Sequence, residues 1–203
     1  MDARSWNERY AATESVWSAG PNRWVQERCE AMPAGRALDL ACGEGRNALW
    51  LAGRGWDVVA VDFSSVAVEK GRALEAHRPT SGIPIDWRVL DVVSQPIPGG
   101  PFDLIVIAYL QLPMPSRRSA HEAAADALAV GGALLVVAHD SSNLADGVGG
   151  PQDPAVLFTA DDVVAELAGT VALQVDEAGV VLRPVEGADR SARDALVRVT
   201  RTG

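Results

Sequence analysis

Two glycines separated by one residue follow a short apolar run early in the chain. Residues 38–52 read LDLACGEGRNALWLA, so Gly43 and Gly45 come after an expected strand and open an expected helix. Glycine allows a tight turn and a close approach of the backbone to a ligand. The N–H groups at a helix start are unpaired donors. Because Gly43-x-Gly45-x-x-Ala48 also matches a dinucleotide fingerprint, the turn alone leaves the ligand open.

Three carboxylates, Asp39, Asp62 and Asp91, lie in or at the ends of three successive expected strands. A buried carboxylate is costly unless something pairs with it, so Asp39 could hold a cationic ammonium or bond to backbone amides. Asp62 stands where a carboxylate accepts both hydroxyls of a ribose, in NAD enzymes as well. Asp91 could contact the edge of an adenine or cap a turn. Together they predict a ligand at the carboxyl edge of a parallel sheet.

Few side chains could move a proton. His139 follows an expected strand at this same edge, so we expect it to touch a substrate, act as a base or anchor a loop. Tyr10 could cover the ligand, face a second substrate or simply pack. His77 and His121 are expected at the surface of helices. No metal-ligand spacing is evident, so we expect catalysis without a metal.

Strand and helix signals alternate between these residues. A helix is expected from Pro21 to Met32, since proline suits a first helical position. Alternation of apolar strands with helices predicts an α/β fold with a doubly wound, mostly parallel sheet. The expected strands are 37–41, 57–62, 85–91, 102–108 and 133–138, the expected helices are 47–53, 64–77, 116–130 and one starting at 159–162, and two β-rich segments, 171–185 and 193–200, follow.

Composition narrows the class of protein. The 203 residues carry a net charge of −9 and no basic run, which disfavours a nucleic-acid partner. Two cysteines are too few for a disulfide framework, and no apolar run is long enough for a membrane span. Without a secretory signal at the first residues, we expect a cytoplasmic protein with no membrane partner. Its oligomeric state is not readable.

The segment from Asp39 to Asn47, with Asp62 and Asp91, resembles the class I S-adenosylmethionine-dependent methyltransferases. The residues CGEGRN (42–47) and the N-terminal residues 6–10 resemble the tellurite-resistance and thiopurine branch of this family, which acts on small molecules. The resemblance implies a seven-stranded sheet whose last hairpin is reversed. One departure is Ala41, which stands where the motif usually has its first glycine.

The resemblance also implies roles for individual residues. Asp39 and the turn would hold the methionine part of S-adenosyl-L-methionine, Asp62 the ribose, and Asp91 the adenine. Residues after the fourth strand would line the sulfonium side. The full set expected to bind the cofactor is Asp39, Ala41, Cys42, Gly43, Gly45, Arg46, Asn47, Asp62, Phe63, Ser64, Asp91, Val92, Ala108, Tyr109 and Leu110.

We therefore expect one methyltransferase domain over residues 1–203, with a helical cap at 1–34 and a lid loop at 139–158. The activity expected is methyl transfer to a small acceptor, such as a thiol, a chalcogen oxyanion or a heterocycle. Two alternatives stay open. One is an NAD-dependent oxidoreductase, and the other is a non-catalytic module that binds S-adenosylmethionine.

Overall fold

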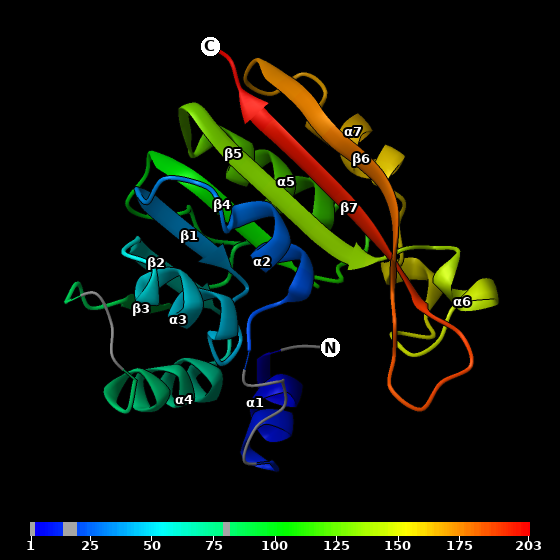
Figure 1. Ribbon diagram of the computed structural model, residues 1–203, viewed down its shortest axis with the longest axis horizontal. Helices are drawn as coiled ribbons and strands as arrows, with labels where there is room; N and C mark the ends of the chain where they lie inside the picture. The colour runs from blue at the N-terminus through cyan, green and yellow to red at the C-terminus, as the bar shows by residue number, and fades with distance from the viewer. Residues whose placement is uncertain (1–2, 14–19, 79–81) are drawn as a thin grey trace. The chain divides into compact units, whose positions relative to one another are not determined.

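The computed structural model describes residues 3–13, 20–78 and 82–203. Within these residues, seven strands form a sheet in the order β3-β2-β1-β4-β5-β7-β6 (Figure 1). The predicted α/β class, with a parallel sheet and a reversed C-terminal hairpin, is confirmed. The chain forms two compact units, Met1–Val106 and Ile107–Gly203, which are described in turn.

The first unit pairs β1, β2 and β3 in parallel, and helices α3 and α4 pack against these strands. The strands β1 and β2 are apolar and almost fully buried, as strands covered on both faces should be. The elements of this unit are α1 (Ala3–Ala11), α2 (Arg23–Cys29), β1 (Arg36–Leu40), α3 (Arg46–Gly53), β2 (Asp57–Asp62), α4 (Ser65–Ala76), β3 (Asp86–Val89) and β4 (Phe102–Ala108), which runs into the second unit.

Local capping residues decide where two of these helices begin. Ser64 caps α4 by accepting the N–H of Ala67, as expected. The prediction that Pro21 is the first helical residue of α2 is wrong. Asn22 is the N-cap, with its side chain accepting the N–H groups of Trp24 and Val25, because an amide oxygen can satisfy these donors.

In the second unit, β7 runs antiparallel to both β5 and β6. Thr159 and Asp162 form a reciprocal capping box at the start of α7, which confirms the predicted helix start. The elements are α5 (Ser116–Asp126), β5 (Leu128–His139), α6 (Asn143–Asp146), a 3-10 turn (Pro154–Val156), α7 (Ala160–Leu167), β6 (Leu173–Arg183) and β7 (Ala192–Arg201).

Two predicted element ends are wrong, and one expected loop holds short helical segments. The helix expected over 116–130 ends at Asp126, and Gly131 and Gly132, which follow the expected end, lie inside β5. Gly131 is exposed and has a φ of 82°, a left-handed conformation that glycine tolerates within this strand. The segment 139–158 is not a bare loop, because it holds α6 and the 3-10 turn. The third strand is shorter than expected and ends at Val89.

Candidate functional site

The glycine turn between β1 and α3 takes three left-handed backbone positions. Ala41, Gly43 and Gly45 have φ values of 60°, 56° and 80°. The turn is tied to β2 because the N–H of Cys42 donates to the carbonyl of Val61 over 3.0 Å. Ala41 therefore adopts the backbone conformation that glycine favours, which explains why a glycine is usual at this point of the motif.

Asp39 is fully buried in β1, directly beneath this turn. Its Oδ2 accepts the N–H of Ala48, in the first turn of α3, over 2.9 Å. Its Oδ1 is buried and has no hydrogen-bond partner among the described residues. Burial, opposed by the Ala48 N–H, the nearby Arg46 and the Asn47 side chain, raises the pKa of Asp39 to about 7. Such a group favours a partner that brings a positive charge or a hydrogen-bond donor.

Asp62 ends β2 and holds the turn in place. Its Oδ2 accepts the N–H of Gly43 over 2.9 Å, and its Oδ1 accepts the N–H of Ser64 over 2.8 Å. Burial raises the pKa of Asp62, and these two bonds oppose that effect. A carboxylate has about four acceptor positions, so each oxygen keeps capacity for one more donor. Asp62 is thus fixed with acceptor capacity to spare.

The carboxylate of Asp91 accepts hydrogen bonds from residues that follow it in the chain. Its Oδ1 accepts the N–H of Val93 and its Oδ2 accepts the hydroxyl of Ser94. These are the contacts of the turn-capping arrangement that the sequence left open. A contact of Asp91 with adenine stays a prediction.

An N-terminal helix is fastened next to the turn. Lys70 donates from α4 to the carbonyls of Tyr10 and Thr13 and to the carboxylate of Glu44, which lies between the two glycines. Ser64 donates its hydroxyl to Asn7 over 2.6 Å. Because Ser64 also contacts Asp62, α1 is connected to the same carboxylate as the turn. The sequence analysis did not identify Asn7, Glu44 or Lys70 as part of this region.

Trp87 in β3 supports the turn from one side. A Cβ built on Gly45 would lie 2.1 Å from its ring, and one built on Gly71 would lie 2.4 Å from it. The ring cannot turn away freely, because its Nε1 donates to Glu75 over 2.7 Å. Two glycines from different elements thus make room for one indole, a contact that no local pattern revealed.

Replacing Gly71 with alanine should lower the free energy of unfolding by about 1–3 kcal/mol, because the added methyl group overpacks the Trp87 ring. Alanine ordinarily stabilises a helix relative to glycine by about 1 kcal/mol, so the sign distinguishes the two effects. Gly53→Ala in α3 is the matched control, since a Cβ there meets nothing within 4 Å. Urea unfolding of both variants gives the comparison. A Gly71→Ala protein as stable as the control would contradict the overpacking.

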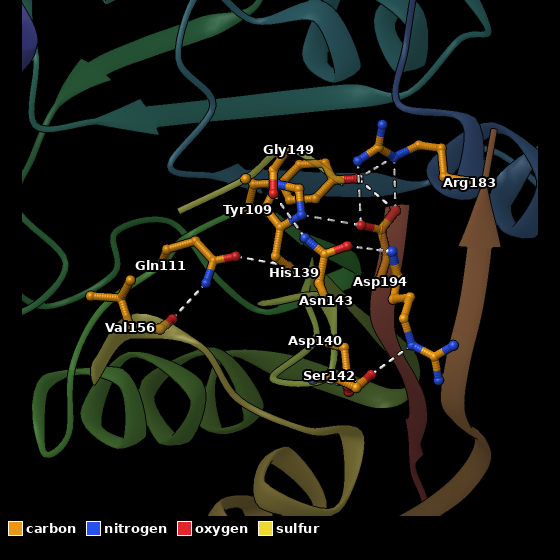
Figure 2. A network of polar contacts seen from close by, with 12 residues as sticks. Tyr109, Gln111, His139, Asp140, Ser142, Asn143, Gly149, Val156, Arg183 and Asp194 are labelled. Atoms are coloured by element: carbon orange, nitrogen blue, oxygen red, sulfur yellow. Dashed lines mark hydrogen bonds and ion pairs between the residues drawn. The ribbon is translucent and has the colours of Figure 1, made fainter. Parts of the chain in front are cut away.

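The second unit holds a polar cluster around Asp194, which is completely buried in β7 (Figure 2). Its Oδ2 accepts the hydroxyl of Tyr109 and the Nε of Arg183, each over 2.9 Å. The Nδ1 of His139 lies 3.5 Å from its Oδ1. Tyr109 has a φ of 62° and its ring stacks obliquely on that of His139, with centroids 4.9 Å apart. A left-handed tyrosine is strained by about 1–3 kcal/mol, which is typical of functional sites.

The segment after His139 is anchored at both ends. Gln111 accepts the N–H of His139 over 2.7 Å and donates to the carbonyl of Val156. Asp140 and Phe158 form an isolated parallel bridge, so the two ends lie side by side. The lid expected at 139–158 and the cap expected at 1–34 stay predictions, and residues 1–2 and 14–19 of the cap lie outside the described residues.

Comparisons with known proteins agree with this geometry. Residues 37–132 match the methyltransferase domain family. The matched residues run from β1 into β5 and include the glycine turn. The chain is 34% identical over 105 residues to the demethylmenaquinone methyltransferase of Beutenbergia cavernae, covering 50% of this chain and 41% of that one. It is 31% identical over 114 residues to the bovine EEF1A lysine methyltransferase 4, covering 52% and 42%. The matched part thus spans about two fifths of these relatives.

Likeness of fold to solved methyltransferases extends over the whole chain. The N-methyltransferase NodS of Bradyrhizobium japonicum, solved with S-adenosyl-L-homocysteine, superposes with a TM-score of 0.75 and covers 100% of both chains. Sequence identity over that superposition is 19%, so it establishes the fold alone.

The remaining residues that the sequence predicts to bind a cofactor differ in their environments. Asn47 is buried and accepts the N–H of Asn22, so its oxygen holds the start of α2. The thiol of Cys42 is buried beside Asp39 and Asp62, and burial raises its pKa well above the ordinary value. Partly exposed side chains belong to Arg46, Phe63, Val92, Ala108, Tyr109 and Leu110.

Tyr10 and His121 are both buried in the structure. Tyr10 is only 3% exposed and packs against Trp6, with ring centroids 5.5 Å apart. This is the packing alternative, and a catalytic role for Tyr10 stays a prediction. The expected surface position of His121 is wrong, since its side chain is completely buried. It contacts Glu166 through Nδ1 over 2.8 Å, together with Arg117.

Within the described residues, no group of three or more His, Cys, Asp or Glu side chains could hold a metal ion. The helices in the same part of the chain include none that is long and apolar enough to cross a membrane.

Proposed function

We propose that this protein is a methyltransferase that uses S-adenosyl-L-methionine and methylates a small molecule. The observation that carries the proposal is the buried Asp39 with an unpartnered Oδ1 beneath the glycine turn. This oxygen fits a cofactor that carries an ammonium group beside a carboxylate. The family match of residues 37–132 supports the same cofactor.

Different residues of the first unit would bind different parts of the cofactor. Asp39 would accept hydrogen bonds from the ammonium of the methionine part, and the left-handed turn at Ala41, Gly43 and Gly45 would let the backbone come close. Asp62 would accept the ribose hydroxyls with the acceptor capacity that Gly43 and Ser64 leave. When bound, S-adenosylmethionine supplies an electrophilic methyl group on a sulfonium.

The acceptor side needs a group that can take a proton when the acceptor is a hydroxyl or an amine. We propose His139 for this role. Burial lowers its pKa, Asp194 raises it, Arg183 lowers it, and the net pKa lies below the ordinary value. His139 is therefore neutral near pH 7 and able to accept a proton.

The small-molecule class rests on the resemblance of CGEGRN and residues 6–10, and on the relative that methylates demethylmenaquinone by its name. The protein-lysine methyltransferase among the relatives is the reason to include a protein substrate in any acceptor panel. The net charge of −9 disfavours nucleic acid.

Calorimetric titration with S-adenosyl-L-homocysteine and, separately, with NAD tests the cofactor. We expect saturable binding of the first and none of the second. Binding of NAD alone would support the oxidoreductase alternative instead. Methyl transfer from radiolabelled S-adenosylmethionine to a panel of thiols, quinols, hydroxylated heterocycles and protein would then separate an enzyme from a module that only binds.

A further inference from the structure

The two oxygens of Asp194 are used unequally. Oδ2 accepts from two strong donors, the Tyr109 hydroxyl and the Arg183 Nε, each over 2.9 Å. Oδ1 accepts one long bond of 3.4 Å from the Nη2 of Arg183. The same Oδ1 lies 3.5 Å from the Nδ1 of His139. The Oδ1 of Asp194 is therefore the oxygen that faces the imidazole.

The Nδ1 of His139 is closed off from other partners. It is buried and makes no hydrogen bond of ordinary length among the described residues. Gly150, with a φ of 76°, covers this side of the ring so closely that a Cβ there would lie 2.8 Å from Nδ1. The Tyr109 ring covers a face of the imidazole. Asp194 is thus the charged group that Nδ1 faces within this enclosure (Figure 2).

An imidazole in this enclosure has one favourable tautomer. A proton on Nδ1 points a positive hydrogen at the Asp194 carboxylate, whereas a lone pair on Nδ1 would face that negative charge. We propose that Asp194 is a positioning residue that keeps the proton of neutral His139 on Nδ1 and so makes Nε2 the basic nitrogen.

The proton balance follows from this tautomer and rests on the proposed function. The O–H or N–H bond of the acceptor breaks, an N–H bond forms at Nε2, and the imidazole becomes an imidazolium beside Asp194. Arg183 already neutralises Asp194, so the imidazolium is held less strongly than it would be by a lone carboxylate. The inference therefore favours acceptors that lose a proton on methylation over acceptors that react as anions.

The charged and titratable groups that face His139 come from several elements. Asp194 lies on β7, Arg183 on β6, and Tyr109 follows β4. Asp140 is next in the chain; its Oδ1 accepts from the backbone N–H and hydroxyl of Ser142, and its Oδ2 is buried without a hydrogen-bond partner among the described residues. Asp194 and Arg183 act on the imidazole in opposite directions, so removing either one should have an effect of opposite sign.

Nitrogen-15 NMR of the imidazoles in the cofactor-free full chain tests the inference. His139→Gln assigns the signal among the three histidines. We expect the proton of neutral His139 on Nδ1 in the wild type. Arg183→Gln should keep this tautomer and raise the titration midpoint by about one pH unit, because a nearby like charge is removed. Asp194→Asn should lower the midpoint and weaken the tautomer preference.

Asp194→Asn leaves Arg183 without its charge partner and could unfold the chain. The double variant Asp194→Asn with Arg183→Gln removes both charges and serves as the second test. In it, the preference for a proton on Nδ1 should again weaken. A wild-type proton on Nε2, or a tautomer preference unchanged in the double variant, would overturn the inference. Since no cofactor is present, such a result is separate from failure of the calorimetric test of the proposed function.

Discussion

Replacing Asp39 with asparagine should stabilise the cofactor-free protein at pH 8 and weaken its binding of S-adenosyl-L-homocysteine. The carboxylate is buried with an unpartnered oxygen, and its pKa is raised to about 7 from 3.8. An amide of the same shape removes the buried charge but still accepts the N–H of Ala48. We expect a gain of at most about 4 kcal/mol, the equivalent of this shift, because the new amide N–H group is itself buried at the position of Oδ1.

The dependence on pH has a definite sign. The folded state binds the Asp39 proton more tightly than the unfolded state, so its stabilising effect is complete below about pH 4. The free energy of unfolding should then fall as the pH rises from about 4 to 7. The raised pKa of Asp62 acts in the same direction. In Asp39→Asn the Asp39 contribution to this slope should disappear, which urea unfolding at several pH values would show.

Although Asp39→Asn should raise stability, it should weaken the binding of S-adenosyl-L-homocysteine. Loss of a charge-assisted hydrogen bond costs about 1.5–3 kcal/mol, so affinity for S-adenosyl-L-homocysteine should fall at least about 10- to 100-fold. Asp57→Asn is the matched control, because Asp57 is half exposed at the start of β2 and its 3.7 Å ion pair with Arg36 is a surface contact. Equal affinity in Asp39→Asn and the control would contradict the assigned role of Asp39.

Glu166→Gln should lower the free energy of unfolding by about 3–5 kcal/mol, because it leaves a buried guanidinium without its counter-charge. Glu166 in α7 accepts from the Nε and Nη2 of Arg117 and from His121, both in α5. Arg117 also stacks over Phe158, with its Cζ 4.5 Å from the ring centroid. The cluster therefore fastens α5 to α7 inside the second unit.

Lowering the pH should reproduce part of the loss of stability that is expected for Glu166→Gln. Burial raises the pKa of Glu166, but the hydrogen bonds from His121 and Arg117 lower it to about 2 overall. A lowered pKa stabilises the folded state above about pH 4.5, and this contribution of about 3 kcal/mol is lost as the pH falls toward 2.

Urea unfolding at pH 7 gives the comparison for this cluster. Asp161→Asn is the control, because Asp161 lies exposed in the first turn of the same helix and should change stability by less than about 1 kcal/mol. A Glu166→Gln protein that unfolds at the control's midpoint would show that the cluster contributes little.

The sequence determined the features that depend on neighbouring residues. The run from Asp39 to Gly45 specifies a strand, a left-handed turn and a helix start, because glycine conformational freedom and the helix N-terminus act over a few residues. The position of Asp62 at the end of a strand was also predictable, because it depends on the apolar residues that directly precede it. The caps at Ser64 and Thr159 were predictable for the same reason, and so was the reversed C-terminal hairpin once the family resemblance was recognised.

Tertiary structure decided which distant side chains meet. Asp194 contacts Tyr109 across 85 positions of the chain, and Arg117 meets Glu166 across 49. Nothing in the periodicity of α5 shows that His121 faces a carboxylate, since an alanine-rich helix gives few apolar positions to mark its buried face. The need for glycine at position 71, and the contact of Gly45 with the same Trp87 ring, become visible only in the folded protein. These contacts depend on sheet register and helix packing, which bring together residues whose local sequences carry no sign of one another.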